Sequence, residues 1–424
     1  MKGALRHLPG KLIRWIGIPL IRTIYRIRVV NAERVPEKGG FLLLPNHITF
    51  ADAFFITVAC PRPVRFVMDE AFMVSRVIRV FVTIFNTVTI RRDQPREAIR
   101  ITIDALKAGD VVCLFPEGQL TRTGALGELR RGFELIAKKA EHPLVPLWCD
   151  GAWGSIFSFE GGRYFRKIPY RMPYPMTMAF GEMIPVETAG LAAVREGLLV
   201  ASAEAQAARF SSAEWGSRMP RGEAEAAESF EVLPELVRRA AWTNGHQIGQ
   251  INALPRQEPF FFLKDDPLPR SVPALALTFP DLFDSAAEPF ESLEAAGPAS
   301  WVGGEVLREA MEKQGPVHAL VFYDFSSRAL EPLEKEGVLH LPCLAVDGVV
   351  VSMSMADPVN ARGADPQPGH KPRSWGKLLP GWYLKADQNG VLRAHGPAAP
   401  SGSVALPVGC TLDKDNFLVA GDPI

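Results

Sequence analysis

Short apolar runs and a helical pattern alternate along the first half of the chain. Three runs, Phe41–Leu44, Val111–Phe115 and Leu144–Trp148, have the continuous apolar character of buried strands. Apolar side chains recur at helical spacing in Arg96–Ala108, and polar and apolar side chains alternate in Tyr25–Val30 as in a half-buried strand. Buried strands that alternate with helices predict an α/β layer fold whose functional site lies where the strands end.

Beyond residue 190 the pattern changes. Leu191–Arg209 has the pattern of a helix, and the polar segment Ser211–Ser229 that follows resembles a connector. The β-like pieces of the remaining chain are short: Ala274–Leu277, Ala319–Phe322, Leu344–Val346 and Val349–Ser352. We predict an N-terminal arm, a first α/β domain, a polar linker and a second, smaller α/β or β-rich domain, at residues 1–24, 25–210, 211–235 and 236–424 in that order.

Composition adds a charge asymmetry to this division. Hydrophobic residues make up 47% and charged residues 22% of the chain, which is typical of a globular protein. Residues 1–190 carry 27 basic and 17 acidic side chains, whereas the remaining residues carry 20 basic and 30 acidic ones. The first half therefore faces an anionic partner: nucleic acid, a phosphate-bearing substrate, an acidic carrier protein or an anionic membrane surface. The five cysteines form no CxxC pair, which disfavours a disulfide framework and a zinc ribbon.

The first 30 residues have the character of a membrane-surface segment. They contain seven basic residues and no acidic one, interspersed with Leu, Ile and Trp. In a helix, Lys11, Arg14 and Arg22 would form a cationic strip beside a broad apolar surface, although Pro19 would bend it. The alternative is a helix that packs on the protein's own core. No run is long enough to cross a bilayer, since the longest, Val80–Ile90, is about half the length required.

Two polar segments begin where predicted strands end. The first, after Phe41–Leu44, contains His47 and Asp52, a spacing that lets a carboxylate orient one imidazole nitrogen while the other faces a cleft. Such a pair is suited to general base catalysis without a metal. The alternative interpretation is an ordinary pair at a helix N-terminus.

The second segment, Phe115–Gly124, follows the next buried strand. Glu117 and Gly118 lie in a turn that lets backbone N–H groups approach a ligand, and Arg122 between two threonines suits a phosphate group. Arg91 and Arg92 end another predicted strand and offer two more guanidinium groups. The alternative interpretation of these features is a surface turn and a solvated basic pair.

The order of these blocks, N-H-x4-D, an Arg-bearing strand end, F-P-E-G and Pro146 in an apolar strand, resembles the glycerolipid acyltransferase superfamily. Further segments, Arg130–Glu134 and Asp150–Ser158, look most like the acyltransferase half of bifunctional 2-acylglycerophosphoethanolamine acyltransferase/acyl-ACP synthetases. The resemblance covers residues 25–185 and implies a mixed sheet flanked by helices.

The resemblance implies a function and a role for each residue. His47 would be the general base and Asp52 its orienting group, while Glu117, Gly118, Arg122 and Arg91 or Arg92 would bind the acceptor's phosphate. The implied reaction moves a fatty acyl group from acyl-ACP or acyl-CoA to a lysophospholipid, in the cytoplasm at the inner face of the cell membrane, without a cofactor, a metal or a nucleic-acid partner. Alternatives are 1-acylglycerol-3-phosphate acylation in phosphatidate synthesis and a non-catalytic module that binds lipid or acyl carrier.

The end of the chain resembles a different family. Gly369–Trp382 is similar to the segment of adenylate-forming synthetases that reads K-x-G-S-x-G-x-x-L-P-G. Asp413–Phe417 followed by Ala420–Asp422 is similar to their D-x-x-G-[FW] and T-G-D segments, with Ala420 in place of Thr. Asn416 replaces a Gly of that pattern, and the phosphate loop ending in P-K-G is absent from the sequence. The resemblance therefore implies a degenerate synthetase domain without adenylating activity.

The N-terminal arm yields the first prediction. Deletion of residues 1–24 should weaken flotation with anionic vesicles, because it removes five of the seven basic residues and the apolar face. Flotation of the wild type should fall as salt rises, since salt screens the attraction to lipid headgroups. Equal flotation of both proteins at low and high salt would contradict a membrane role for the arm.

Overall fold

The computed structural model describes most of the first half of the chain and parts of the second. The described residues are 24–69, 87–90, 95–165, 174–211, 243–244, 247–248, 260–261, 300–303, 307–309, 311, 318–324, 339–358, 365–399 and 401–420. The predicted arm up to residue 23, Arg91, Arg92, the linker from residue 212, the strand predicted at Ala274–Leu277 and Asp422 lie outside these residues. The domain boundaries proposed from the sequence stay a prediction.

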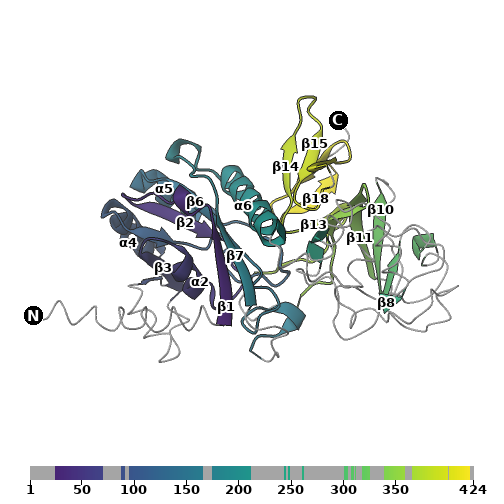
Figure 1. Ribbon diagram of the computed structural model, residues 1–424, viewed down its shortest axis with the longest axis horizontal. Helices are drawn as coiled ribbons and strands as arrows, with labels where there is room; N and C mark the ends of the chain where they lie inside the picture. Colours follow the sequence, from purple (N-terminus) through teal and green to yellow (C-terminus); the bar gives the residue numbers. More distant parts are fainter. Residues whose placement is uncertain are drawn as a thin grey trace, which may run out of the picture. The chain divides into compact units, whose positions relative to one another are not determined.

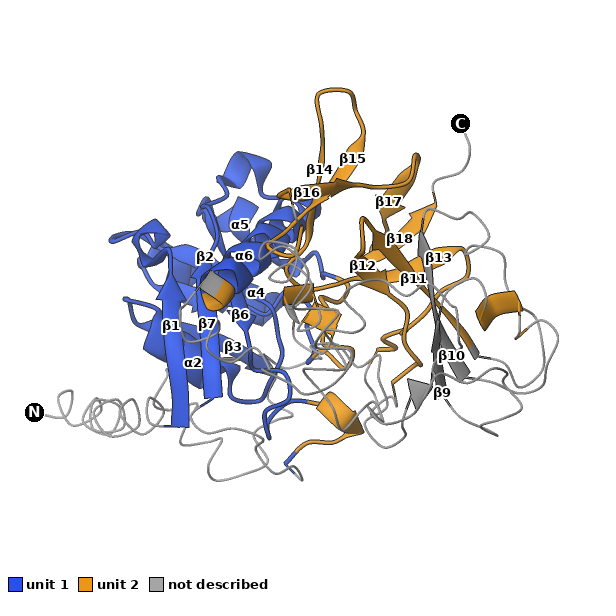
Figure 2. Cartoon of the chain, turned by 45° about the vertical axis from the view of Figure 1, so that its right-hand side comes forward, with its two compact units in different colours: residues 1–120, 129–158, 165–208 blue, residues 121–128, 159–164, 209–424 orange. Residues whose placement is uncertain are grey.

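The chain divides into two compact units (Figure 2). Unit 1 contains residues 1–120, 129–158 and 165–208, and unit 2 contains residues 121–128, 159–164 and 209–424. Two short segments, 121–128 and 159–164, thus cluster with the second half of the chain although their sequence neighbours belong to unit 1. The segment 121–128 includes Arg122, one of the predicted site residues.

Unit 1 is built on a seven-stranded mixed sheet with the order β1-β7-β6-β2-β5-β3-β4 (Figure 1). Its strands are β1 (Tyr25–Val30), β2 (Phe41–Pro45), β3 (Val64–Asp69), β4 (Val88–Ile90), β5 (Val111–Cys113), β6 (Leu144–Asp150) and β7 (Tyr174–Phe180). The strands from β6 to β4 are parallel, β7 is antiparallel to β6, and β1 is parallel to β7. The predicted mixed sheet is confirmed.

The central strand of this sheet is completely apolar. Phe41, Leu42, Leu43 and Leu44 in β2 have no exposed surface, as expected for a parallel strand covered on both faces. A Cβ atom on Gly40, which precedes β2, would lie 2.1 Å from the backbone oxygen of Leu106, so the chain enters β2 in direct contact with a helix. The core of unit 1 is therefore built around β2, the strand that leads to His47.

The helices described in unit 1 include the two that the sequence predicted, at close to the predicted positions. They are α2 (Asp52–Ala59), α4 (Pro95–Lys107), α5 (Gly132–Ala140) and α6 (Leu191–Ser211), with short 3-10 turns η1 (Ala32–Arg34) and η4 (Val186–Thr188). The helix predicted over Arg96–Ala108 is α4, which starts one residue earlier because Pro95 is well suited to a first helical turn. Glu204 of α6 accepts hydrogen bonds from Arg34 and Asn31, which fastens α6 to the segment after β1.

Unit 2 is rich in β-structure. An eight-stranded sheet has the order β17-β18-β13-β12-β11-β10-β9-β8, and a separate antiparallel sheet has the order β14-β15-β16. The strands are β8 (Phe260–Phe261), β9 (Ser300–Gly303), β10 (His318–Asp324), β11 (Leu339–Val346), β12 (Val349–Met353), β13 (Ser374–Leu378), β14 (Tyr383–Ala386), β15 (Leu392–His395), β16 (Ser403–Ala405), β17 (Cys410–Leu412) and β18 (Phe417–Ala420). The strands predicted at Ala319–Phe322, Leu344–Val346 and Val349–Ser352 lie in β10, β11 and β12. A second, β-rich part of the fold is thereby confirmed.

None of the helices in the described part of the chain is both long and apolar enough to cross a membrane.

Candidate active site

The pairing of β2 with β5 brings the two predicted polar segments together. The strands are parallel neighbours in which Phe41 pairs with Val111 and Leu43 pairs with Cys113. Because parallel strands in register end at the same edge of a sheet, residues 46–52 and 114–118 leave the sheet side by side. The sequence predicted a site at strand ends, and this register places its two main segments at one edge.

His47 and Asp52 form a direct pair in this edge. Asp52 is the first residue of α2, and its side chain is 1% exposed. Its Oδ2 atom lies 2.9 Å from Nδ1 of His47 and also accepts hydrogen bonds from the backbone N–H groups of Ile48 and Thr49 at 2.8 and 3.0 Å. Its Oδ1 atom accepts a hydrogen bond of 2.6 Å from the Thr49 hydroxyl. The carboxylate is thus surrounded by groups that donate hydrogen bonds to it.

The hydrogen bonds of Asp52 determine the tautomer of His47. An ionised carboxylate can only accept hydrogen bonds, so Nδ1 of His47 carries the hydrogen and Nε2 has a free lone pair. The imidazole stacks on the Phe115 ring with a centroid distance of 3.8 Å and an angle of 19°, and its side chain remains 21% exposed. The ring is held on two sides while Nε2 is available as a proton acceptor. This geometry is that of a general base with an orienting carboxylate.

The Glu117 side chain holds the backbone of His47 in place. The Oε1 atom of Glu117 accepts a hydrogen bond of 2.8 Å from the backbone N–H of His47, and the residue is 4% exposed. Gly118 has φ +69°, a left-handed conformation that favours glycine, and its N–H donates to the Phe115 carbonyl at 3.1 Å. The F-P-E-G turn therefore places a buried carboxylate against the histidine segment. The sequence suggested a contact with phosphate for Glu117 and gave no sign of this backbone contact.

Asn46 and Thr49 are site residues to which the sequence analysis assigned no role. The Asn46 side chain accepts a hydrogen bond from the Cys149 N–H at 2.7 Å and donates one to the Cys149 carbonyl at 3.3 Å, so it joins the end of β2 to β6. The Thr49 hydroxyl links Asp52 to the Ala51 N–H at 3.1 Å. Both residues lie inside the N-H-x4-D block, which is the signal that could have identified them.

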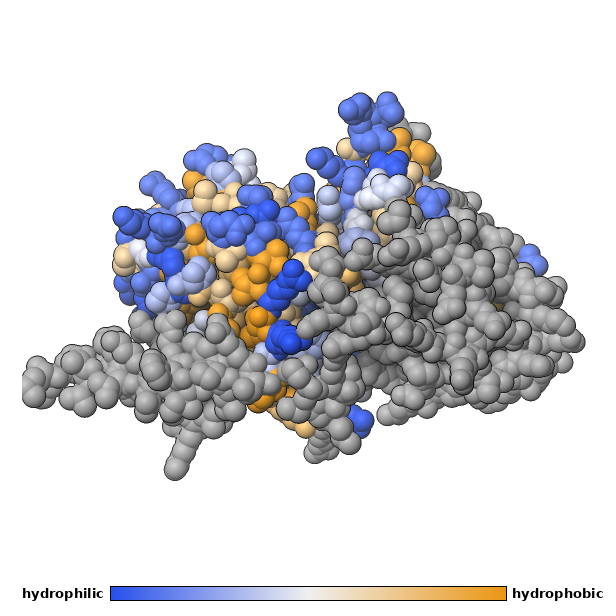
Figure 3. All heavy atoms as spheres, viewed as in Figure 1, coloured by the Kyte–Doolittle hydropathy of each residue, from blue (hydrophilic) through white to orange (hydrophobic). Residues whose placement is uncertain are grey.

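Phe50, on the same loop as His47, packs with aromatic side chains from a later segment of the chain. Phe50 is 46% exposed and stacks on Phe165, which is 61% exposed, with ring centroids 5.5 Å apart. Phe157 packs edge-on against Phe165, and its carbonyl accepts a hydrogen bond from the Phe50 N–H. Apolar residues are also exposed among polar ones on the face of unit 1 shown in Figure 3. Phe50, three residues after His47 in the sequence, thus contributes to an exposed apolar surface that suits a substrate carrying hydrocarbon.

Arg122 belongs to unit 2 and is 7% exposed. Its backbone N–H donates to Oε1 of Gln367 at 2.8 Å, and its guanidinium carbon lies 4.8 Å from the centre of the Phe159 ring. Burial raises the pKa of nearby Tyr164, and the charge of Arg122 opposes this shift. The structure therefore brings together four of the predicted site residues, His47, Asp52, Glu117 and Gly118. It describes Arg122 separately, within unit 2.

Within the described ranges, no three His, Cys, Asp or Glu side chains come together as a metal site. Pro146, the apolar-strand proline of the four-block pattern, lies in β6 opposite Leu44. A Cβ atom on Gly197 would lie 2.7 Å from its ring, so Pro146 packs closely against α6.

Comparisons with known proteins find acyltransferases that are similar to part of this chain. Residues 26–150 match the profile of the Acyltransferase family. A 1-acyl-sn-glycerol-3-phosphate acyltransferase of Bacillus subtilis is 27% identical over 139 residues, which cover 32% of this chain and 69% of that enzyme. An enzyme of the same name from Limnanthes douglasii is 26% identical over 191 residues, which cover 43% of this chain and 60% of its own length. A crystal structure of a 1-acyl-sn-glycerophosphate acyltransferase from Thermotoga maritima aligns with 47% of this chain and 81% of its own, with 18% identity and a TM-score of 0.38.

The matched region is only part of these relatives. It covers 60% of the Limnanthes douglasii enzyme and 41% of a chloroplast enzyme of Arabidopsis thaliana with the same activity in its name. The family match nevertheless coincides with the sheet and loops that carry His47 and Asp52. The comparisons support placement in the glycerolipid acyltransferase superfamily and confirm the prediction of an O-acyltransferase enzyme. The resemblance to bifunctional enzymes stays a prediction.

The hydrogen bonds of Asp52 yield the second prediction. In Asp52→Asn the amide oxygen can still accept from the Ile48 and Thr49 N–H groups, so the loop should keep its shape and the melting temperature should change little. The negative charge that stabilises a protonated His47 is lost, so kcat should fall by about 10²-fold. Steady-state kinetics and thermal unfolding of the purified variant test both expectations.

Asp110→Asn is the matched control, because Asp110 makes a partly exposed ion pair with Arg65 and should leave kcat unchanged. An Asp52→Asn variant with the kcat of the wild type would show that Asp52 does not act on the reaction.

Proposed function

We propose that this protein transfers a fatty acyl group from acyl-ACP or acyl-CoA to the free hydroxyl of 1-acylglycerol-3-phosphate. The observation that carries the proposal is the hydrogen bond from Nδ1 of His47 to the buried Asp52, which leaves Nε2 as the proton acceptor at the edge of the sheet. The relatives named as 1-acylglycerol-3-phosphate acyltransferases support this acceptor.

The proposed reaction needs one base and no covalent enzyme intermediate. Nε2 of His47 removes the proton of the acceptor hydroxyl as its oxygen attacks the thioester carbonyl carbon. Asp52 stabilises the resulting imidazolium ion through Nδ1. The tetrahedral intermediate then expels the thiolate of the carrier, which takes the proton back from His47. An ester bond forms and a thioester bond breaks, and the histidine returns to its starting state.

The anionic acceptor suits the basic side chains predicted for the site. Arg122, together with Arg91 or Arg92, is proposed to bind the phosphate of the acceptor, since a planar guanidinium group forms paired hydrogen bonds with phosphate oxygens. The hydrocarbon chains of the substrates are proposed to contact the exposed Phe50 and Phe165. The excess of basic residues in the first half of the chain also suits an acidic carrier protein and an anionic membrane surface.

A second acceptor class is lysophospholipids with a larger headgroup, such as 2-acylglycerophosphoethanolamine. The segments Arg130–Glu134 and Asp150–Ser158 favour it through their resemblance to the bifunctional enzymes. The reaction at His47 would be the same for both classes. Only the contacts to the headgroup would differ.

We further propose that the last part of unit 2 is a degenerate synthetase segment. Arg373 and Asn416 stand where the synthetase pattern has Gly, and their φ angles of 55° and 62° keep the left-handed conformation that glycine would adopt. Ser374 accepts the N–H of Gly376, and Lys377 donates to the Asp415 carbonyl, so these polar groups bond within the segment itself. A positive φ at the two positions where the pattern has glycine supports the relationship to synthetases.

The third prediction tests the proposed function. Purified full-length protein should acylate 1-acylglycerol-3-phosphate with acyl-ACP or acyl-CoA in a panel of lysolipids. His47→Ala should lower kcat by about 10²–10⁴-fold, the usual contribution of general base catalysis. His395→Ala, in the β14–β15 hairpin of unit 2, is the control and should retain activity. Near wild-type transfer by His47→Ala, or acyl groups bound covalently to the protein during turnover, would contradict the mechanism.

The fourth prediction concerns the degenerate segment. The full-length protein should show no fatty-acid-dependent exchange between ATP and pyrophosphate, because the sequence contains no phosphate loop to bind a triphosphate. Exchange above the background measured without fatty acid would refute the proposal that the segment has lost adenylating activity.

A further inference from the structure

The segment 121–128, which carries Arg122, is fixed by its own hydrogen bonds. The Thr121 hydroxyl donates to the Ala125 carbonyl at 2.8 Å and accepts the Gly124 N–H at 3.1 Å. The Ala125 N–H also donates to the Thr123 hydroxyl at 3.3 Å. Residues 121–126 are all buried. A buried loop needs partners for its remaining backbone groups, and these come from the C-terminal part of unit 2.

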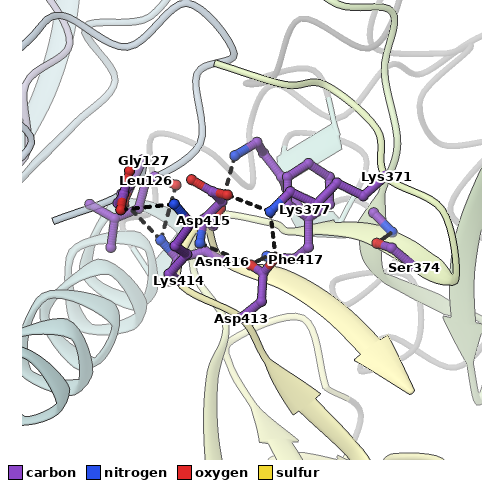
Figure 4. A network of polar contacts seen from close by, with 12 residues as sticks. Leu126, Gly127, Lys371, Ser374, Lys377, Asp413, Lys414, Asp415, Asn416 and Phe417 are labelled. Atoms are coloured by element: carbon purple, nitrogen blue, oxygen red, sulfur yellow. Dashed lines mark hydrogen bonds and ion pairs between the residues drawn. The ribbon is translucent and has the colours of Figure 1, made fainter. Parts of the chain in front are cut away.

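A tight turn between β17 and β18 presents the main partner, Asn416 (Figure 4). Oδ1 of Asp413 accepts the N–H groups of Asp415 and Phe417, both at 2.9 Å, and the Asn416 N–H donates to the Asp413 carbonyl at 3.2 Å. Lys371 bridges the carboxylates of Asp413 and Asp415 and lies 4.8 Å from the centre of the Phe417 ring. The turn is therefore rigid, and its geometry directs the Asn416 side chain.

The Asn416 amide bonds to the far end of the Arg122 segment. Its Nδ2 atom donates to the carbonyls of Leu126 at 3.2 Å and Gly127 at 3.0 Å, and the residue is 1% exposed. Gln367 bonds to the near end, where its Oε1 accepts the Arg122 N–H at 2.8 Å. Two side chains more than 240 residues away in sequence thus hold both ends of the segment.

Asn416 combines two properties, of which a glycine at this position would have only the first. Asparagine tolerates the left-handed backbone that the turn requires, here with φ 62°. Its side chain also supplies an amide with two N–H donors for two carbonyls, which glycine lacks. The departure from the synthetase pattern at residue 416 therefore has a physical effect: it converts a turn into an anchor for the segment 121–128.

We propose that Asn416 and Gln367 are positioning residues for the acyl acceptor, because they hold the segment through which Arg122 binds the acceptor's anionic headgroup. This inference rests on the proposed function. It gives the degenerate synthetase segment a role in acyl transfer: without adenylating anything, it sets the affinity for the anionic acceptor and leaves the affinity for the acyl donor unchanged.

The fifth prediction uses Asn416→Gly in the full-length protein, because glycine keeps the turn and removes only the amide. The KM for 1-acylglycerol-3-phosphate should rise about 10-fold, which corresponds to the loss of an anchoring interaction of ordinary strength, while the KM for the acyl donor stays within about twofold. Asn389→Gly, in the exposed turn between β14 and β15, is the matched control and should change neither constant.

A double-mutant cycle separates positioning from a general loss of stability. Arg122→Ala should also raise the acceptor KM, and Asn416→Gly should add nothing to it in the double variant, since both changes remove the same interaction. Additive effects of the two substitutions, or equal changes in the donor and acceptor KM values, would overturn the inference. Gln367→Ala removes the contact at the other end of the segment and should reproduce the acceptor effect if Asn416→Gly does not fold.

The same experiment distinguishes the inference from the function on which it rests. Absence of acyl transfer by the wild-type protein would contradict the proposed function and the inference together. An active Asn416→Gly variant with an unchanged acceptor KM would overturn the inference alone.

Discussion

The parallel pairing of β2 with β5 is the constraint on which the site depends. Leu43 lies opposite Cys113 in this pair, so the chain leaves both strands at the same edge and at nearly the same height. A shift of register by one residue would turn every side chain of β2 to the opposite face of the sheet. The side chains of Phe41–Leu44 are completely buried, so such a shift would disrupt their close packing on both faces of the sheet. Core packing thereby positions the loop that carries His47 and Asp52.

Two buried carboxylates then fix His47 from different sides. Asp52 holds the ring through Nδ1, and Glu117 holds the backbone through the His47 N–H. Burial of a carboxylate without partners would be costly, and the hydrogen bonds to Asp52 from Ile48, Thr49 and His47 reduce that cost. Because both carboxylates are tied to the protein, the imidazole needs little reorganisation when it accepts a proton. Glu117 thus acts on His47 whether or not it also contacts a substrate.

The sequence was informative where local patterns determine structure. Continuous apolar runs predicted β2, β5 and β6, and helical spacing predicted α4 and α6. In each of these elements the pattern of apolar residues within the segment indicates which side chains are buried. Contacts between distant backbone groups have no such signature. The His47 N–H donates to Glu117 across 70 positions of the sequence, and Asn416 donates to the Leu126 carbonyl across 290. Every residue type has a backbone carbonyl and almost every type has a backbone N–H, so the sequence does not mark these partners. The same reason applies to the segment 121–128, because nothing in its own residues signals that it clusters with the second half of the chain.

The anchor at Asn416 depends on the charge of Lys371, which joins the two carboxylates of the turn. Burial lowers the pKa of Lys371, but the hydrogen bonds to Asp413 and Asp415 outweigh this effect and raise the pKa above its ordinary value. A lysine whose pKa is higher in the folded protein contributes stability at every pH below its unfolded pKa and loses that contribution only as the pH rises through the folded value. The turn therefore keeps its ion pairs throughout the neutral range, as long as both carboxylates stay ionised. Lys371 consequently stabilises the turn across the neutral range, so the hydrogen bonds from Asn416 to the Leu126 and Gly127 carbonyls do not depend on pH through this lysine.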